Sequence, residues 1–221
     1  MLEFNPMSGL LHANSPMHLF PILQDIKEIN SIYSIVAIRD FVFSTIPLFL
    51  KPIDTIIDKD NVWNMYKQFL LLEAGGWCGL NADYFRSLLY WYQIKTHPYN
   101  FGISSLGITH MGVIVDYDGE EFFMDPYLAV HYVHKDGFLL TFKHLMALIV
   151  ERKLDRIVPV FSDVCKPVEQ HDGTFVMMTP QEIQKSMFMG RSPSGRPYEE
   201  VMKEVFGQTS PLLLMLINIV G

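Results

Sequence analysis

Residues 75–90, GGWCGLNADYFRSLLY, decide the expected fold because they place a cysteine between a double glycine and a helical pattern. Apolar side chains recur there at spacings of three or four, which indicates one face of a helix, at Leu80, Tyr84, Leu88 and Trp91. The helix is predicted to begin near Cys78, just after the glycines. A helix N-terminus lowers the pKa of a thiol, and its free amides bind anions.

After Pro98 the sequence pattern changes. Short apolar runs are separated by turn residues, which is typical of strands. Asp118-Gly119, between two such runs, is a strong hairpin signal. Across that hairpin, residues whose numbers sum to about 236 or 237 should face each other. Asp125 should therefore lie within one or two positions of His110 on a neighbouring antiparallel strand, close enough for their side chains to meet.

These three residues have the chemistry of a nucleophilic thiol site. A thiol reacts as a thiolate, which a helix start and a nearby imidazolium favour, and this points to Cys78 as nucleophile. His110 is predicted to be its base, and Asp125 the acceptor that fixes the histidine tautomer. Each residue also has a purely structural interpretation. Cys78 would be a buried structural thiol, His110 a core histidine and Asp125 an aspartate that starts a turn.

The strings GGWCGLNADYFRSLLY and THMGVIVDYDGEEFFMDPY resemble the transglutaminase-like superfamily, in which Gly-x-Cys opens a helix, histidine starts a strand and Asp-Pro closes the next. The resemblance covers about residues 62–127. It implies a papain-like fold with Cys78, His110 and Asp125 as the catalytic triad. Many members have an aromatic residue shortly after the histidine, whereas a methionine and a glycine follow it here.

Two alternatives stay open beside this resemblance. GGWC is also similar to arylamine N-acetyltransferases, which acetylate their cysteine with acetyl-CoA, although that family usually has arginine before the glycines and Glu73-Ala74 stand here. The acyl thioester would then be a cosubstrate. The second alternative is a protein-binding module without catalysis, which would use the apolar residues 211–221 or an arginine loop.

Five further residues are site candidates. Trp77 and Asn81 flank the cysteine and would line the acyl site, or else serve in packing and helix capping. Gln68 would donate to the oxyanion, or else lie on a helix surface. Arg191 and Arg196, in MGRSPSGRP, would hold a carboxylate or phosphate, or else belong to a solvated loop.

No metal or resident cofactor is expected. His131 and His134 are three residues apart, which puts them on opposite faces of a strand, so solvated histidines are predicted there. There is no cysteine pair of the kind that binds zinc, and Cys165 is interpreted as structural.

The whole chain predicts an α+β fold, with the Cys78 helix packed on an antiparallel sheet and helices before and after. Residues 1–221 are assigned to one transglutaminase-like domain, with an N-terminal helical part (1–57), a catalytic core (58–135) and a C-terminal part (136–221).

Local patterns fill in this outline. They predict one or two helices within residues 21–50, a helix from Asp60 to the double glycine and a helix over 141–153. A strand at 157–161 and a helix from Thr179-Pro180 follow, and the methionine-rich run from Phe175 is interpreted as core packing.

The composition of the chain argues against some classes of binding partner. The formal charge of −7 argues against nucleic acid and anionic membranes, and the 49% hydrophobic content indicates a large core. Two cysteines and the absence of a recognisable secretion signal favour the cytoplasm. The apolar run 211–221 is about half of the roughly 20 residues that span a bilayer, so no transmembrane segment is expected.

These observations together predict a cysteine-dependent acyl-transfer enzyme that acts on an amide or thioester through a thioacyl-enzyme intermediate. Amide hydrolysis or transamidation is the favoured form. The expected partner is an amide- or thioester-bearing substrate, with proteins and peptides among the candidates. The acceptor, water or an amine, depends on the shape of the site.

Overall fold

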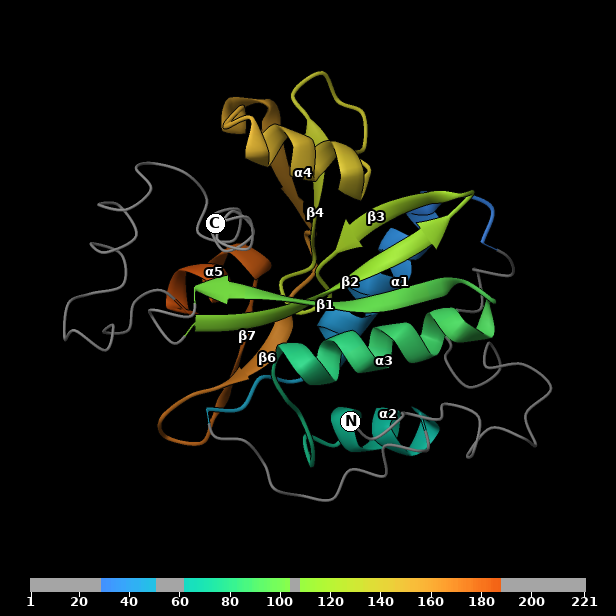
Figure 1. Ribbon diagram of the computed structural model, residues 1–221. Helices are drawn as coiled ribbons and strands as arrows, with labels where there is room; N and C mark the ends of the chain where they lie inside the picture. The colour runs from blue at the N-terminus through green and yellow to red at the C-terminus, as the bar shows by residue number, and fades with distance from the viewer. Residues whose placement is uncertain (1–28, 51–61, 104–107, 188–221) are drawn as a thin grey trace.

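A three-stranded antiparallel sheet forms the centre of the structure, a computed structural model that describes residues 29–50, 62–103 and 108–187. Its strands β1 (Lys95–Ile103), β2 (Ile108–Tyr117) and β3 (Glu120–Met124) lie in the order β1-β2-β3. The described residues form a mixed α+β structure, as the sequence predicts. Figure 1 shows the helices arranged around this sheet.

The β2–β3 hairpin turns at Asp118 and Gly119, as expected. Both residues have positive φ, 55° and 77°, which is the backbone of the tight turn that Asp-Gly favours. The register pairs Val113 with Met124, which is one of the two predicted registers. It brings the chain after β3 back alongside the start of β2, where His110 lies.

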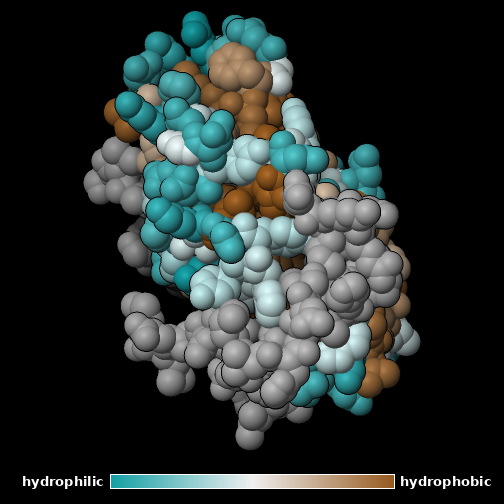
Figure 2. Space-filling view, turned by 90° about the vertical axis from the view of Figure 1, so that its right-hand side faces the viewer, coloured by the Kyte–Doolittle hydropathy of each residue, from teal (hydrophilic) through white to brown (hydrophobic). Residues whose placement is uncertain are grey.

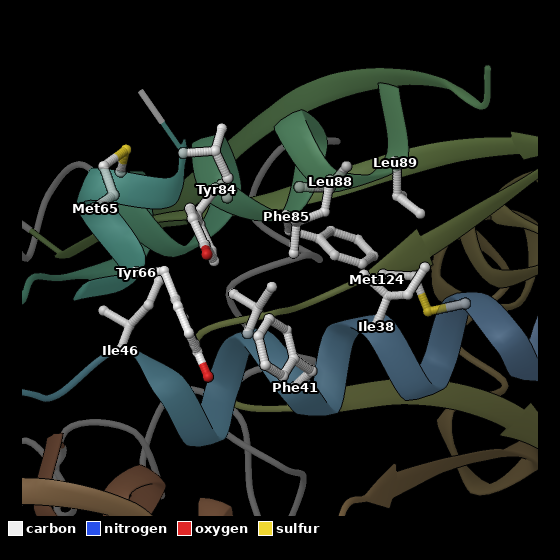
Figure 3. Close-up of a cluster of buried hydrophobic side chains, with 14 of the residues drawn as sticks. Ile38, Phe41, Ile46, Met65, Tyr66, Tyr84, Phe85, Leu88, Leu89 and Met124 are labelled. Carbon is white, nitrogen blue, oxygen red and sulfur yellow. The ribbon is translucent and has the colours of Figure 1, made fainter. Parts of the chain in front are cut away.

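Three helices cover one face of this sheet. Helix α3 (Cys78–Trp91) begins at the cysteine, as the sequence predicts, and runs along β1 and β2 (Figure 1). Helices α1 (Ile32–Thr45) and α2 (Val62–Leu70) pack against it. Figure 3 shows their buried side chains meeting, with Met124 of β3 beside those of α1 and α3. This apolar cluster fixes the direction of α3 relative to the sheet.

Helix α2 ends earlier than the sequence indicates. It stops at Leu70 instead of continuing to the double glycine. Leu72 adopts a left-handed conformation (φ 55°), and the amides of Glu73 and Ala74 bond to the Gln68 carbonyl, which closes the helix without glycine. The glycines belong to the extended segment that leads into α3.

A second apolar cluster joins the rest of the described chain to the opposite side of the sheet. It includes β4 (Val130–His134), β5 (Ile157–Phe161) and α4 (Phe142–Val150), which is capped by Thr141. A 3₁₀ turn, η4 (Leu154–Arg156), precedes β5. The predicted strand at 157–161 is therefore confirmed, and so is the helix after Thr141, although it ends at Val150 instead of Lys153.

The hairpin of β6 (Lys166–Glu169) and β7 (Phe175–Met178) was not predicted. Val168 and Met178 pack on the second cluster, but Met177 is 62% exposed, so the interpretation of this whole run as core is wrong. Along β6, buried residues alternate with partly buried ones, whereas β7 exposes its two central residues, Val176 and Met177. Helix α5 (Pro180–Met187) follows, with the expected reciprocal cap between Thr179 and Glu182.

Some expectations fall on residues outside the described part of the chain. These are the helix start at Asp60, any helix before residue 29, the loop with Arg191 and Arg196, and the apolar run 211–221. Within the described ranges, no helix is both long and apolar enough to cross a bilayer. On the face seen in Figure 2, hydrophobic side chains lie in patches between hydrophilic ones.

Gly112 on β2 allows Phe123 to pack directly over the strand. A Cβ at position 112 would come within 2.5 Å of the Phe123 ring, whereas a Cβ at Gly79 would meet nothing within 4 Å. Gly112→Ala is therefore expected to lower the free energy of unfolding by about 1–3 kcal/mol. Gly79→Ala, within helix α3, should raise it by about 0.5–1 kcal/mol. Urea unfolding of both variants tests this; equal effects would contradict the packing described here.

Candidate active site

Cys78 is the first residue of α3 and is partly buried. Trp77, the N-cap residue, is extended and provides no side-chain cap, and the first turn holds no acidic residue. The sharp approach to the helix depends on Gly75, because a Cβ there would lie 2.3 Å from the Pro47 carbonyl oxygen. The thiol thus sits at an uncapped helix start, where the partial positive charge favours a thiolate.

His110 lies on β2, directly opposite Phe101 of β1, and is 2% exposed. The edges of two aromatic rings hold the imidazole, with centroid distances of 5.2 Å to Phe101 and 5.6 Å to Tyr127. The Nε2 atom of the ring is 2.7 Å from Oδ2 of Asp125. This hydrogen bond leaves Nδ1 for the thiol of Cys78.

Asp125 lies just beyond β3 and is completely buried. While Oδ2 binds His110, Oδ1 accepts the amides of Tyr127 and Leu128 at 2.9 and 3.0 Å. Its backbone also pairs with Val130, which connects β3 to β4. The residue therefore starts a turn and contacts the histidine at the same time, so the two sequence interpretations of Asp125 do not exclude each other.

Cys78 and His110 form a polarised pair. Burial alone raises the pKa of the Cys78 thiol, but the hydrogen bond and charge of His110, with the Met111 amide, outweigh burial and lower that pKa. Burial likewise lowers the pKa of His110, but the Asp125 carboxylate and the Cys78 thiolate raise it to about 10. Between the lowered pKa of Cys78 and about pH 10, the site holds a thiolate beside an imidazolium.

A buried lysine that the sequence did not single out lies beside this pair. Lys166 is fully buried, and its Nζ donates to Oδ1 of Asn81 at 3.2 Å. It also lies over the rings of Tyr127 and Phe43. Burial lowers the pKa of Lys166 to about 7, against the opposing charge of Asp125. Nothing in the stretch SDVCKPV marks this lysine as a core residue, since burial depends on the tertiary fold.

Asn81 is part of the interior and does not form an open wall of the site. It is 0% exposed, and its amide nitrogen donates to the carbonyls of Gly76 and Trp77. Trp77 is 53% exposed, and its indole nitrogen donates to the Phe49 carbonyl, so it stands at the surface next to the thiol. Of these two candidates, Trp77 is the one accessible to a substrate.

Gln68 lies on α2 and is partly buried. Its side-chain oxygen is buried and has no hydrogen-bond partner among the described residues. Its backbone carbonyl closes α2. Its assignment as oxyanion donor therefore stays a prediction.

The expectation of a solvated His131 is wrong. Its side chain is buried, and its Nδ1 is 2.7 Å from the guanidinium of Arg39, which also bonds to Asp40. Burial and the Arg39 charge lower the pKa of His131 to about 4, so it is neutral at pH 7. His134 is only partly exposed and pairs with Asp136. The error arose because strand alternation does not reveal which helix covers a face.

Three other features were candidates for a site: the second cysteine, a cluster of metal ligands and a surface pocket. Cys165 is a free, partly buried thiol. Across the described ranges, no group of three or more His, Cys, Asp or Glu side chains could hold a metal ion. A shallow open pocket lies at the hairpin end of the sheet, several residues along β2 from His110, and is lined by Gln93, Ile94, Lys95, Asp116, Tyr117 and Asp118. It contains neither a thiol nor a histidine.

Comparisons with known proteins return no match to any protein-family model, curated protein or solved structure.

Proposed function

We propose that this chain is a cysteine-dependent acyl-transfer enzyme in which Cys78 is the nucleophile, His110 the general acid and base, and Asp125 the residue that orients the histidine. One observation carries the proposal: the thiol at a helix start is close enough to a buried imidazole for that ring to lower the thiol pKa, and the far nitrogen of the ring is 2.7 Å from a buried carboxylate. We further propose that the finer fold is transglutaminase-like and papain-like. The order and placement of these three residues support it.

The proposed reaction starts from the thiolate–imidazolium pair. The Cys78 sulfur attacks the carbonyl carbon of the substrate, a C–S bond forms, and the carbonyl oxygen becomes an oxyanion. The amides in the uncapped first turn of α3 are suited to bind this oxyanion. As the C–N or C–S bond to the leaving group breaks, His110 gives its proton to the departing nitrogen or sulfur. A thioester on Cys78 remains.

The second half of the cycle reverses these roles. His110, now neutral, takes a proton from water or an amine, whose oxygen or nitrogen attacks the thioester. The acyl group leaves on the acceptor, and the cysteine returns as a thiolate beside the imidazolium. Asp125 keeps the proton of the neutral ring on Nε2, so that Nδ1 is free to act as the base.

The raised pKa of His110 favours amide substrates. An amine leaves an amide only when it is protonated, whereas a thiolate leaves a thioester without this help. In the resting pair the imidazolium keeps its proton up to about pH 10, so His110 is already protonated when a substrate binds in the neutral range. Amide hydrolysis or transamidation is accordingly the form of the reaction that the site supports best.

The test is to trap the acyl group. The protein is incubated with an activated ester, an acyl-CoA and a glutamine-containing peptide, with and without a small primary amine, and its intact mass is recorded. We expect one acyl group per chain, mapped by peptide analysis to Cys78, and its loss on addition of the amine. Equal acylation of Cys78 and Cys165, or acylation of lysines alone, would overturn the proposal.

A further inference from the structure

Lys166 is fully buried although it carries an ionisable amine, which makes it costly unless its contacts compensate. It is the first residue of β6, far along the chain from both halves of the proposed site. Its Nζ donates a hydrogen bond to Oδ1 of Asn81 and lies over two aromatic rings, with Nζ–centroid distances of 4.6 Å to Phe43 and 5.1 Å to Tyr127. These contacts lead in two directions.

One direction leads to the nucleophile. The side chain of Asn81 has one acceptor oxygen and two donor hydrogens, and that oxygen, Oδ1, accepts from Nζ of Lys166. The amide nitrogen then faces the carbonyls of Gly76 and Trp77, at 3.2 and 2.9 Å. These carbonyls belong to the two residues just before Cys78. The orientation of the amide therefore holds the segment that sets the direction of the thiol.

The other direction leads to the histidine and its carboxylate. The Tyr127 ring, over which Nζ of Lys166 lies, makes an edge-type contact with the His110 ring at a centroid distance of 5.6 Å. The backbone amide of the same tyrosine donates to Oδ1 of Asp125. The charge of Asp125 also acts on Lys166 directly. One side chain thus touches the supports of both halves of the site.

We propose that Lys166 is a positioning residue that holds the Cys78 segment, through Asn81, in place against the His110–Asp125 pair. The inference rests on the proposed function, because it assigns Lys166 to the same reaction. Lys166 does not touch the reacting atoms; it acts through Asn81 and Tyr127. The β6 strand is also held by backbone bonds between Leu48 and residues Pro167 and Glu169, so the hairpin has other attachments when the ammonium is removed.

The test uses Lys166→Met, which keeps an unbranched apolar stem and removes the donor. Its matched control is Lys143→Met, which makes the same change at an exposed position of α4. The readout is the rate constant for alkylation of Cys78 by iodoacetamide from pH 5 to pH 10, with peptide mapping to separate it from Cys165. We expect Lys166→Met to react about tenfold more slowly, with a midpoint at higher pH, because the thiol and the imidazole lose alignment. Lys143→Met should match the wild type.

A second pair of variants shows whether the effect passes through Asn81. Asn81→Leu should also slow alkylation, and Lys166→Met/Asn81→Leu should be no slower than the slower single variant, since both break one path. If the rate losses of the two single variants multiplied in the double variant, Lys166 would not act through Asn81. A wild-type alkylation rate and midpoint in Lys166→Met would overturn the inference even if the melting temperature of the variant changed. Should Lys166→Met not fold, an unchanged rate in Asn81→Leu would overturn it equally. Failure of the proposed function gives a different result: wild-type Cys78 would react no faster than Cys165.

Discussion

Replacement of Cys78 by alanine is expected to abolish acyl transfer, with kcat/KM falling by at least about 10⁴-fold on any substrate that the wild type turns over. The reason is that the covalent step has no other nucleophile, since the group that receives the hydrogen bond of His110 is the sulfur itself. The partly buried side chain is small, so stability should change little. Turnover of the substrates found by acyl trapping measures the effect.

Cys165→Ala is the matched control for this experiment. It removes the other free thiol, which lies in a different part of the chain and is likewise partly buried. Its kcat/KM should equal that of the wild type. If Cys78→Ala retained turnover while Cys165→Ala lost it, the assignment of the nucleophile would be wrong.

Asp125→Asn should lower kcat by about 10⁴-fold while the chain still folds. An asparagine can keep its Oδ1 toward the amides of Tyr127 and Leu128, so its NH₂ group would face Nε2 of His110. The neutral histidine must then carry its proton on Nδ1, beside the thiol, where it cannot accept another. The charge that raises the pKa of His110 to about 10 is also lost, so this pKa should fall.

The control for this change is Asp118→Asn, at the exposed tip of the β2–β3 hairpin. It is the same chemical substitution, and Asn-Gly suits this turn as well as Asp-Gly does. Its kcat should be that of the wild type. Measurement of kcat for both variants, with NMR titration of His110, separates orientation from folding. An unchanged kcat in Asp125→Asn would remove Asp125 from the proposed triad.

The part of the site that the sequence predicted depends on patterns within short stretches of the chain. The start of α3 at Cys78 follows from the double glycine and the helical spacing after it. The approach of Asp125 to His110 follows from one hairpin, because Asp118-Gly119 sets the register of every pair beyond it. The two residues are fifteen positions apart, so a single turn is enough to bring them together.

The part that the sequence did not predict depends on contacts between distant segments. Lys166 meets Asn81 across 85 positions, and Arg39 meets His131 across 92. The spacing of residues along the chain does not predict such long-range pairs. A lysine or histidine in a short strand is expected to be exposed to solvent when the segment that covers it is not known. The β6–β7 hairpin was missed for a related reason, since β6 is stabilised by pairing with Leu48 in another part of the chain.

The central claim is that Cys78 is an ionised thiol beside His110, and its alkylation rate as a function of pH tests this most directly. Cys165 in the same molecule is the internal reference. Because the folded pKa of Cys78 is lowered, its reactive thiolate persists to lower pH than an ordinary thiolate does, and it is lost as pH falls through that lowered value. We predict that Cys78 is alkylated faster than Cys165 at pH 7, with a midpoint at lower pH. Equal rates and a shared midpoint near the ordinary thiol pKa would contradict the account.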